Sequence, residues 1–414
     1  MNALQPHDQT LSNVLVPSSL IKDSKQFGGA AVRDCLSGDL ILRNGRAHSL
    51  RRSSHGETGQ LVLPKLTECH VHLDKCHTIS RMDAVGGDLR AAIDKQEADK
   101  QNWTAEDLRN RASRGLGELI AAGCGTVRSH VDWAGLAGVT DLPLAWHVLK
   151  EVAEEHANEV QLQISPLIGI DEYAVPGFAD KVAAQLAGAA GVLGAFVLDH
   201  QDRKTAIRNV VEAAEKHDLA LDFHVDEGLS PGLDGLELIA DAVIETGYAG
   251  PVLCGHACSL ANFSPDDLAR LAEKLRRANI TIASLPVTNL YLQGRTGGTP
   301  DRRGLTRIRE LRELGVPVII GTDNVRDAFS PLGRHDPIES LKHAVLAAHL
   351  DPPFADHLPM VTTDAESAVG LSRTTVDGAA IDDLIIFPSS STADLLSQSC
   401  SPASLSQRLK GETA

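Results

Sequence analysis

The sequence predicts an α/β fold: a (β/α)8 barrel of the TIM type, with a small β-domain formed by the two chain ends. Two observations carry this prediction. Eight short apolar runs each end in polar or ionisable residues, and segments of helical periodicity lie between them. Eight strands alternating with helices are what a closed barrel requires. The 414 residues leave room for one barrel domain and a smaller accessory domain.

Each expected strand is short and continuously apolar, which suits a parallel sheet buried on both faces. An open doubly wound sheet is the alternative architecture. No Gly-x-Gly-x-x-Gly sequence follows the first strand, so the nucleotide-binding version of that sheet lacks its phosphate loop. The expected strands span residues 61–66, 125–130, 160–167, 194–198, 219–224, 251–256, 280–285 and 316–321.

The helices between these strands are predicted from local signals. Thr104 precedes Glu106 and Asp107 as an N-cap, and apolar residues then recur on one helical face from Leu108 onward. Ser264 followed by Pro265 is a typical helix start. Helices are expected over residues 204–218, 236–246 and 264–278.

The two chain ends contain isolated strand-like pieces, at residues 13–16, 39–42 and 382–387. We expect them to combine into one small β-domain beside the barrel. The predicted division is residues 1–60 and 373–414 for the two parts of this domain, and 61–372 for the barrel. The serine-rich tail after Ser389 is expected to be partly mobile.

Composition narrows the class of protein. Hydrophobic residues make up 43% of the chain, enough for a sizeable core, and the net charge of −16 argues against nucleic acid or an anionic membrane as partner. Residues 1–19 lack the features of a secretory signal, and no stretch reaches the roughly 18 apolar residues of a membrane span. We therefore expect a cytoplasmic protein. Its seven cysteines are expected to be mostly reduced thiols.

Three residues, Cys254, His256 and Cys258, alternate and would share one face of a strand. They suggest a thiolate zinc site as one interpretation. Inert packing is favoured, because no second cysteine pair stands at zinc-finger spacing elsewhere.

The ends of the predicted strands are rich in metal ligands, and strand ends are where barrel active sites lie. The first strand leads into His70 and His72, whose spacing directs both imidazoles to one side of an extended chain. The fifth, sixth and eighth strands lead into His224, His256 and Asp323. Histidines and a carboxylate facing one cavity predict an open site for zinc or iron.

Such an ion lowers the pKa of bound water from about 16 towards about 7, so hydroxide is available at neutral pH. Glu227, three residues beyond His224, is expected to take the proton of this water and pass it to a leaving nitrogen. His256 would stabilise developing negative charge, and Asp323 would both bind metal and accept a proton. The alternatives are a solvated loop carboxylate for Glu227, a hydrogen-bonded core histidine for His256 and a helix N-cap for Asp323.

Taken together, these motifs resemble the cytosine deaminase group of the amidohydrolase superfamily. The resemblance covers most of the chain from about residue 61 to 371. It rests on PKLTECHVHLDK at 64–75, RSHVD at 128–132, HVDE at 224–227, LQGR at 292–295 and GTDN at 321–324.

The resemblance implies a site for one metal ion, zinc or iron(II), with His70, His72, His224 and Asp323 as ligands. Glu227 would be the proton shuttle and His256 would lie near the attacking water. Binuclear relatives need a bridging lysine on the fourth strand, and GAFVLDH at 194–200 contains none. The resemblance also implies a small heterocyclic substrate and leaves open a homo-oligomer.

Three positions set this chain apart from cytosine deaminases. Leu167 stands where they place a glutamine that reads the pyrimidine, Asn324 replaces a second aspartate, and Phe329 takes the place of a tryptophan. A site built to hydrogen-bond one ring rejects analogues that leave its polar groups unpaired, so these substrate-binding positions predict a different base. Cytosine, pterins, creatinine-like rings and modified pyrimidines all remain candidates.

The sequence therefore predicts an enzyme that removes an exocyclic amino group from a nitrogen heterocycle and releases ammonia. A second hypothesis is hydrolysis of a ring amide or of an N-alkylamino-triazine by the same residues. A third, from another class, is an inactive barrel that acts as a binding protein. The third predicts loss of a ligand or of Glu227, and neither is lost.

Overall fold

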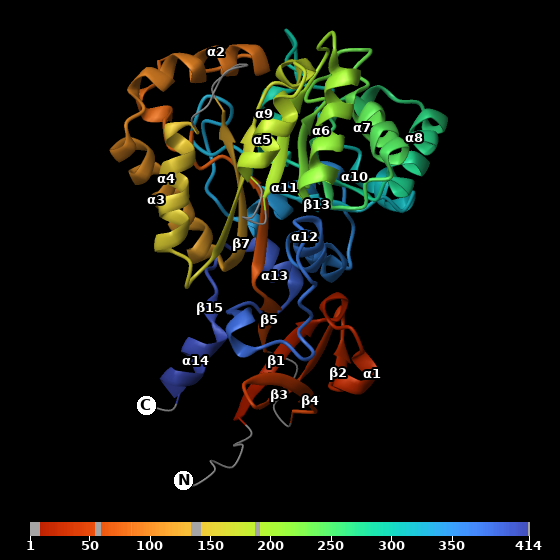
Figure 1. The fold of residues 1–414 in the computed structure, drawn as a ribbon. Helices are drawn as coiled ribbons and strands as arrows, with labels where there is room; N and C mark the ends of the chain where they lie inside the picture. Colours follow the sequence, from red (N-terminus) through yellow and green to blue (C-terminus); the bar gives the residue numbers. More distant parts are fainter. Residues whose placement is uncertain (1–8, 54–58, 84, 134–141, 187–190, 413–414) are drawn as a thin grey trace.

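The computed structural model describes residues 9–53, 59–83, 85–133, 142–186 and 191–412. Its ribbon divides into a large part, in which helices surround a group of strands, and a smaller part built mainly of strands (Figure 1). Both chain ends lie at the smaller part. None of the helices in these ranges is long and apolar enough to cross a membrane.

Within the described ranges, eight strands form the centre of the large part, and every neighbouring pair is parallel. They fall into two sheets, β6-β7-β8 and β9-β10-β11-β12-β13. Isolated parallel bridges join Gly169 to Phe196 and Val71 to Asp323, at the outer strands of the two sheets. The strands are β6 (Leu66–Val71), β7 (Cys124–Asp132), β8 (Gln161–Leu167), β9 (Val192–Val197), β10 (Ala220–Val225), β11 (Val252–His256), β12 (Ile280–Ser284) and β13 (Val318–Ile320).

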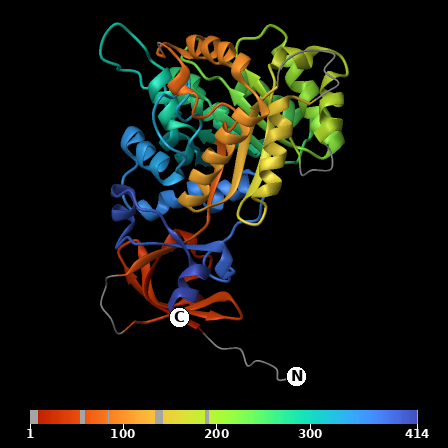
Figure 2. The ribbon, with the colours of Figure 1, turned by 90° about the vertical axis from the view of Figure 1, so that its left-hand side faces the viewer.

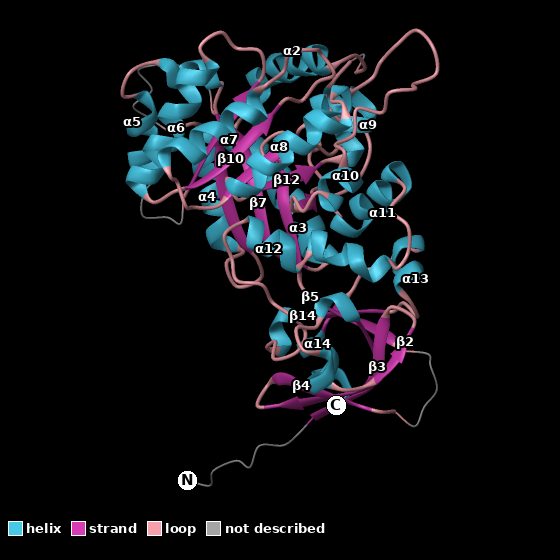
Figure 3. Cartoon of the chain, turned by 90° about the vertical axis from the view of Figure 1, so that its right-hand side faces the viewer, coloured by secondary structure: helices cyan, strands magenta, loops and turns pink. Residues whose placement is uncertain are grey.

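Helices pack around these strands and bury apolar faces against them, so the large part is a mixed α/β fold (Figure 3). Their starts follow the predicted local signals. The Thr104 side chain accepts a hydrogen bond from the Asp107 amide, and Ser264 accepts one from Asp267. The principal helices are α2 (Leu89–Asp99), α3 (Ala105–Ala122), α4 (Leu144–Glu155), α5 (Phe178–Leu186), α6 (Arg203–His217), α7 (Gly235–Thr246), α8 (Pro265–Arg277) and α11 (Pro337–Ala348).

Shorter helices complete the large part or follow it. They are α9 (Pro286–Leu292), α10 (Ile308–Glu313), α12 (Thr363–Ala368), α13 (Thr392–Ser397) and α14 (Leu405–Glu412), with α1 (Ser24–Phe27) near the N-terminus. The tail after Ser389 is expected from its sequence to be partly mobile. In the structure it contains α13, β15 (Ala403–Ser404) and α14, as far as residue 412.

The two chain ends share one seven-stranded sheet, as predicted (Figure 2). Its order is β15-β14-β5-β1-β3-β2, with β4 paired to β3. The C-terminal strand β14 runs antiparallel to β5, with Leu61 opposite Phe387. The other strands are β1 (Gln9–Pro17), β2 (Ala30–Val32), β3 (Cys35–Arg43), β4 (Arg46–Arg51), β5 (Gln60–Pro64) and β14 (Leu384–Phe387).

The prediction of residues 61–66 as the first strand of the barrel is wrong. This apolar run divides at Lys65: β5 ends at Pro64 in the sheet of the chain ends, and β6 begins at Leu66. The Lys65 amide donates to Asp383, whereas the Leu66 amide donates to Gly123 at the start of β7. Hydrophobicity alone cannot separate two consecutive buried strands that belong to different sheets.

Candidate metal centre and active site

The C-terminal ends of the parallel strands bring the predicted metal ligands together. His70 lies in β6, His72 follows it, and His224 lies in β10. Asp323 follows β13, and its amide donates to the His70 carbonyl. All four residues are at most 4% exposed. Parallel strands place these ends on the same face of the fold, so side chains far apart in sequence share one site.

Donor atoms of these four residues lie at distances suited to a shared cation. His72 Nε2 is 3.1 Å from His224 Nε2, and Asp323 Oδ1 is 3.3 Å from His72 Nε2 and 3.6 Å from His70 Nε2. Neither ring nitrogen of His70 has a hydrogen-bond partner within the described chain. Burial lowers the pKa of His70, His72 and His224 well below the usual value, which keeps the rings neutral, the form that binds metal. The residues therefore fit one divalent ion.

His130, which sequence analysis quoted in a motif without giving it a role, joins this cluster from β7. Potential ligand atoms of His70, His72, His130 and His224 all lie within 4.8 Å of one another. Its Nε2 also lies 3.0 Å from Asp222 Oδ1. His130 ends a predicted strand just as His224 does, so the strand-end criterion was sufficient to identify it.

Asp222 connects His130 to the protein interior. Its other oxygen accepts a 3.0 Å hydrogen bond from Arg128 Nη1, and both of these side chains are buried. Burial opposes ionisation of Asp222, but His130 and Arg128 outweigh it and hold the pKa of the carboxyl below its usual value. A buried carboxylate thus stands directly behind the histidine cluster.

Glu227 and His256 lie next to the predicted metal ligands. Glu227 Oε1 is 3.5 Å from His256 Nδ1, and Nδ2 of Asn289 lies 3.1 Å from the same ring nitrogen. Burial, with a contribution from Asp323, raises the pKa of Glu227 well above its usual value. Burial lowers the pKa of His256 to about 4. The pair therefore combines a carboxyl group that holds a proton more tightly than usual with a neutral imidazole.

The position of Glu227 is fixed by its neighbour in the sequence. Asp226 has φ of 51°, and its carboxylate accepts hydrogen bonds from the amides of Gly235 and Leu236, at the start of α7. This capping interaction holds the loop after β10. The loop therefore carries Glu227 on the same side as His224.

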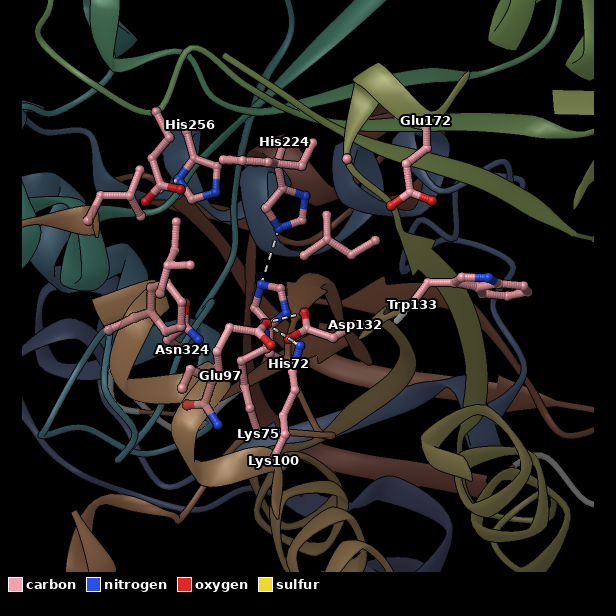
Figure 4. A pocket seen from close by; sticks show the side chains of 18 residues that line it. His72, Lys75, Glu97, Lys100, Asp132, Trp133, Glu172, His224, His256 and Asn324 are labelled. Atoms are coloured by element: carbon pink, nitrogen blue, oxygen red, sulfur yellow. Dashed lines mark hydrogen bonds and ion pairs between the residues drawn. The ribbon is translucent and has the colours of Figure 1, made fainter. Parts of the chain in front are cut away.

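A partly buried group of charges, not predicted from the sequence, lies near His72. Lys75 Nζ donates to Asp132 Oδ1 at 2.6 Å, and Lys100 Nζ lies 3.2 Å from Asp132 Oδ2 (Figure 4). Burial opposes ionisation of Asp132, but the two lysines hold the pKa of this carboxyl well below its usual value. Lys75 also lies 5.3 Å from the centre of the Phe329 ring.

A cavity of about 400 Å³ opens onto His72, His224, Glu227 and His256. This volume is in the range of small-molecule sites. Figure 4 shows His224 and His256 on one side and Trp133, Asp132 and Lys75 on the others. The remaining lining residues are Leu89, Ile93, Gln96, Glu97, Lys100, Leu167, Gly169, Glu172, Phe196, Asn324 and Phe329.

All three predicted substrate-binding residues line this cavity. Leu167 ends β8, Phe329 lies against Lys75, and the Asn324 side chain donates from Nδ2 to Asp327 Oδ2 at 2.6 Å. The residues predicted from the sequence did not include Trp133, Glu172, or Gln96 and Glu97 of α2. Trp133 directly follows β7 and was open to the strand-end criterion, whereas nothing in the pattern of α2 indicated that it covers the site.

The alternative thiolate site receives no support from the described residues. Cys254 and Cys258 are buried, and burial raises the pKa of both thiols well above the usual value, which disfavours the thiolate form. Neither thiol belongs to any group of three potential ligands found in the described ranges, whereas His256 joins His70 and Asp323.

Comparison with known proteins agrees with this arrangement. Residues 82–378 match the family model described as "Amidohydrolase family". A curated relative, a pterin deaminase of Rhizobium rhizogenes strain K84, is 31% identical over 94% of this chain and 90% of its own length.

Solved structures share the fold. A 5-methylcytosine deaminase from Klebsiella pneumoniae, liganded with 5-fluorocytosine, superposes with a TM-score of 0.78 at 23% identity, over 96% of each chain. An N-isopropylammelide isopropylaminohydrolase from Burkholderia multivorans gives a TM-score of 0.70 at 20% identity, over 95% of this chain and 97% of that one. The resemblance predicted from the motifs is thus confirmed: this chain belongs to the amidohydrolase family.

Proposed function

We propose that this chain is a metal-dependent hydrolytic deaminase, which replaces an exocyclic amino group of a nitrogen heterocycle by oxygen and releases ammonia. The observation that carries the proposal is the convergence of His72, His224 and Asp323 beside a cavity that His72, His224 and Glu227 line. The similarity to a pterin deaminase over nearly the whole chain supports it.

His70, His72, His224 and Asp323 are the proposed ligands of one ion, zinc or iron(II). The donor set is three neutral imidazoles and a carboxylate, which suits a borderline first-row cation with an open position. When bound, the ion supplies hydroxide at neutral pH by lowering the pKa of water. His130 lies close enough to the other histidines to be a further nitrogen ligand of the ion. Alternatively, its ring, positioned by the contact with Asp222, is suited to hydrogen-bond a water molecule.

Glu227 is the proposed proton shuttle. Its raised pKa lets it carry a proton near neutral pH, as a group that first accepts and then donates a proton must. Delivery of that proton to the leaving nitrogen converts a poor leaving group into ammonia.

His256 is proposed to stabilise negative charge on the attacked ring. A hydrogen bond donated by Asn289 Nδ2 to Nδ1 of His256 places the ring proton on Nε2, the nitrogen left to donate. Its lowered pKa keeps the ring neutral, so it acts as a hydrogen-bond donor without a full charge.

The proposed substrate is a pterin or a related amino-substituted ring. Leu167, Phe329, Trp133 and Phe196 give the cavity apolar and aromatic surface for a flat ring. Gln96, Glu97 and Glu172 stand at the same cavity and can hydrogen-bond the ring edge. The leucine at position 167 offers no hydrogen bond to a pyrimidine amide, which disfavours cytosine.

The proposed architecture is a closed (β/α)8 barrel from β6 to β13, with the chain ends as a separate small β-domain. The bridges Val71–Asp323 and Gly169–Phe196 support closure, because they stand at both junctions between the two parallel sheets. Closure would explain why ligands from β6 and β13 meet. With β5 in the small sheet, the proposed barrel begins at Leu66 and ends near residue 372.

The test is ammonia release from a panel of amino-substituted pterins, purines, pyrimidines and triazines. We expect a pterin to give the highest kcat/KM and cytosine to turn over poorly. Efficient turnover of cytosine would refute the interpretation of Leu167. Absence of ammonia from every ring, with metal present, would refute deamination.

Hydrolysis of an N-alkylamino-triazine is the second candidate. It is favoured by the similarity, at 22% identity over 68% of this chain and 67% of the relative, to an N-isopropylammelide isopropyl amidohydrolase of Pseudomonas sp. strain ADP. Its products would be an alkylamine and a triazine ring that carries oxygen in place of that amine. Chromatography of the released amine separates the two candidates.

A further inference from the structure

A second cluster of potential metal ligands lies away from the active-site cavity. Ligand atoms of His77, Glu118 and His335 all lie within 4.8 Å of one another. His77 follows β6, Glu118 lies on α3, and His335 stands two residues before α11. None of the three lines the cavity of about 400 Å³. We propose that this cluster is a second, structural binding site for a divalent first-row cation such as Zn²⁺.

The geometry fits such an ion. His77 Nε2 is 3.4 Å from Glu118 Oε1, and His335 Nδ1 is 3.0 Å from Glu118 Oε2. In a tetrahedral zinc site with bonds of about 2.1 Å, ligand atoms lie about 3.4 Å apart. Two imidazoles and one carboxylate form a donor set that zinc uses in proteins, and the fourth position is left to water.

His77 supplies an independent observation. Its side chain is only 3% exposed, yet neither ring nitrogen has a hydrogen-bond partner among the described residues. A buried polar group without a hydrogen-bond partner loses its interaction with water and gains none in return. His77 also has φ of 60°, an unfavourable backbone conformation for a residue with a Cβ. A buried ring held in this way towards a carboxylate and a second imidazole is typical of a ligand.

His335 also has one ring nitrogen without a partner in the described chain, although its Nδ1 pairs with Glu118 Oε2 at 3.0 Å. Its side chain is fully buried, and its Nε2 has no hydrogen-bond partner among the described residues. It approaches α3 closely because residue 115 is glycine: a Cβ there would lie 3.0 Å from His335 Cε1 and 3.1 Å from Cys76 Sγ. Glycine in a helix interior is less favourable than alanine, so close packing of His335 is a physical reason for it.

Charged side chains around the cluster affect how a cation would bind there. Glu118 is its carboxylate, with a side chain 26% exposed, and Arg114 Nε lies 3.6 Å from Glu118 Oε1. Arg114 is 55% exposed and can move into solvent when a cation binds. Arg326 lies near enough to disfavour protonation of both histidines, and its Nε donates to the Gly333 carbonyl. Two rings that remain neutral are suited to bind metal.

The position of the cluster suggests what the ion does. It joins three segments: the loop after β6, helix α3 and the segment before α11. The His77 amide donates to the carbonyl of Val325, two residues beyond Asp323, so the first loop already contacts the loop after β13. An ion here would stabilise the loops that carry His72 and Asp323 on the side away from the cavity, without contacting substrate.

The test is the zinc content of the full-length protein after loading with Zn²⁺ and gel filtration. We expect about two zinc ions per chain in the wild type and about one in Glu118→Gln, which keeps the size of the side chain. His335→Asn is a second variant of the same site, but it changes a fully buried residue and can fail to fold. Glu118 is partly exposed, so Glu118→Gln is expected to fold and to test the site by itself. His156→Asn is the matched control: His156 Nδ1 also lies 3.1 Å from a glutamate, Glu159, without a third ligand, and its zinc content should equal that of the wild type.

An active-site variant, His72→Asn, separates this proposal from the proposed function. Loss of one ion in Glu118→Gln, with deamination retained, supports the second site. The proposal is overturned if Glu118→Gln binds as much zinc as the wild type. The wild type could instead bind a single ion that is lost in His72→Asn and kept in Glu118→Gln. That result would also overturn the second site and leave the proposed function intact. The reverse pattern would support the second site and refute the active-site ligands.

Discussion

His72 Nε2 lies 3.1 Å from His224 Nε2, although 152 residues separate the two histidines in the chain. Two buried, neutral imidazoles that face each other this closely are suited to share a cation. We expect a chelator of divalent metals to abolish activity, and Zn²⁺ or Fe²⁺ to restore it. Circular dichroism should show that the fold survives. Full activity in metal-free protein would contradict the proposed ligands.

Glu227→Gln should lower kcat by roughly 10²- to 10⁴-fold, because an amide cannot take up and deliver the proton. The metal content should be unchanged, since Glu227 is not a proposed ligand. The measurement is steady-state ammonia release with parallel metal analysis. If the variant keeps wild-type kcat, another group moves the proton.

Leu167→Gln should reduce kcat/KM for a pterin by roughly 10-fold or more. When the pterin binds, the new amide gives up its hydrogen bonds to water and finds no partner on the apolar ring face. The same change should favour cytosine, whose amide edge can pair with glutamine. The ratio of the two kcat/KM values is the measurement. Leu346→Gln, at an exposed leucine 65% accessible, is the control and should leave the ratio unchanged.

Asp222→Asn should destabilise the fold strongly, because it leaves the buried charge of Arg128 without its carboxylate. Breaking a buried ion pair by removing one partner costs about 3–5 kcal/mol. Urea unfolding measures the free energy. The exposed pair of Arg208 and Glu212 is the comparison, and Glu212→Gln should leave the unfolding midpoint unchanged. Equal effects of the two changes would contradict the argument.

His357 should make stability depend on pH. Burial lowers the pKa of this ring, whose Nδ1 faces Arg312 and whose Nε2 faces the Asp351 carbonyl. The unfolded chain therefore binds a proton first, near pH 6.5, so stability present above that pH is lost as pH falls towards the folded-state pKa.

The measurement is urea unfolding at pH 7.5 and 5.5. His357→Gln should lose less stability between these values than the wild type. His349→Asn, at an exposed histidine in the left-handed conformation, should behave like the wild type. Identical pH dependence in His357→Gln and the wild type would refute the role of His357.

The candidate site residues could be selected from the sequence because, in a barrel, the chemistry lies at strand ends, which the sequence marks by a change from apolar to ionisable residues. His70, His72, His224, His256 and Asp323 all follow this rule, and the structure brings them together. His130 follows it too. Leu167, Asn324 and Phe329 were placed by resemblance, and all line the cavity.

The sequence by itself determined the alternation of strands and helices, the helix caps at Thr104 and Ser264, and the common sheet of the two chain ends. These depend on local periodicity and on side chains that bond to nearby amides. Tertiary structure decided what depends on contacts between distant segments: the division at Lys65, the buried Lys75–Asp132 pair, and the position of α2 over the cavity. It alone placed His77, Glu118 and His335 together, because no spacing in the sequence relates residues that packing, and not periodicity, brings into contact.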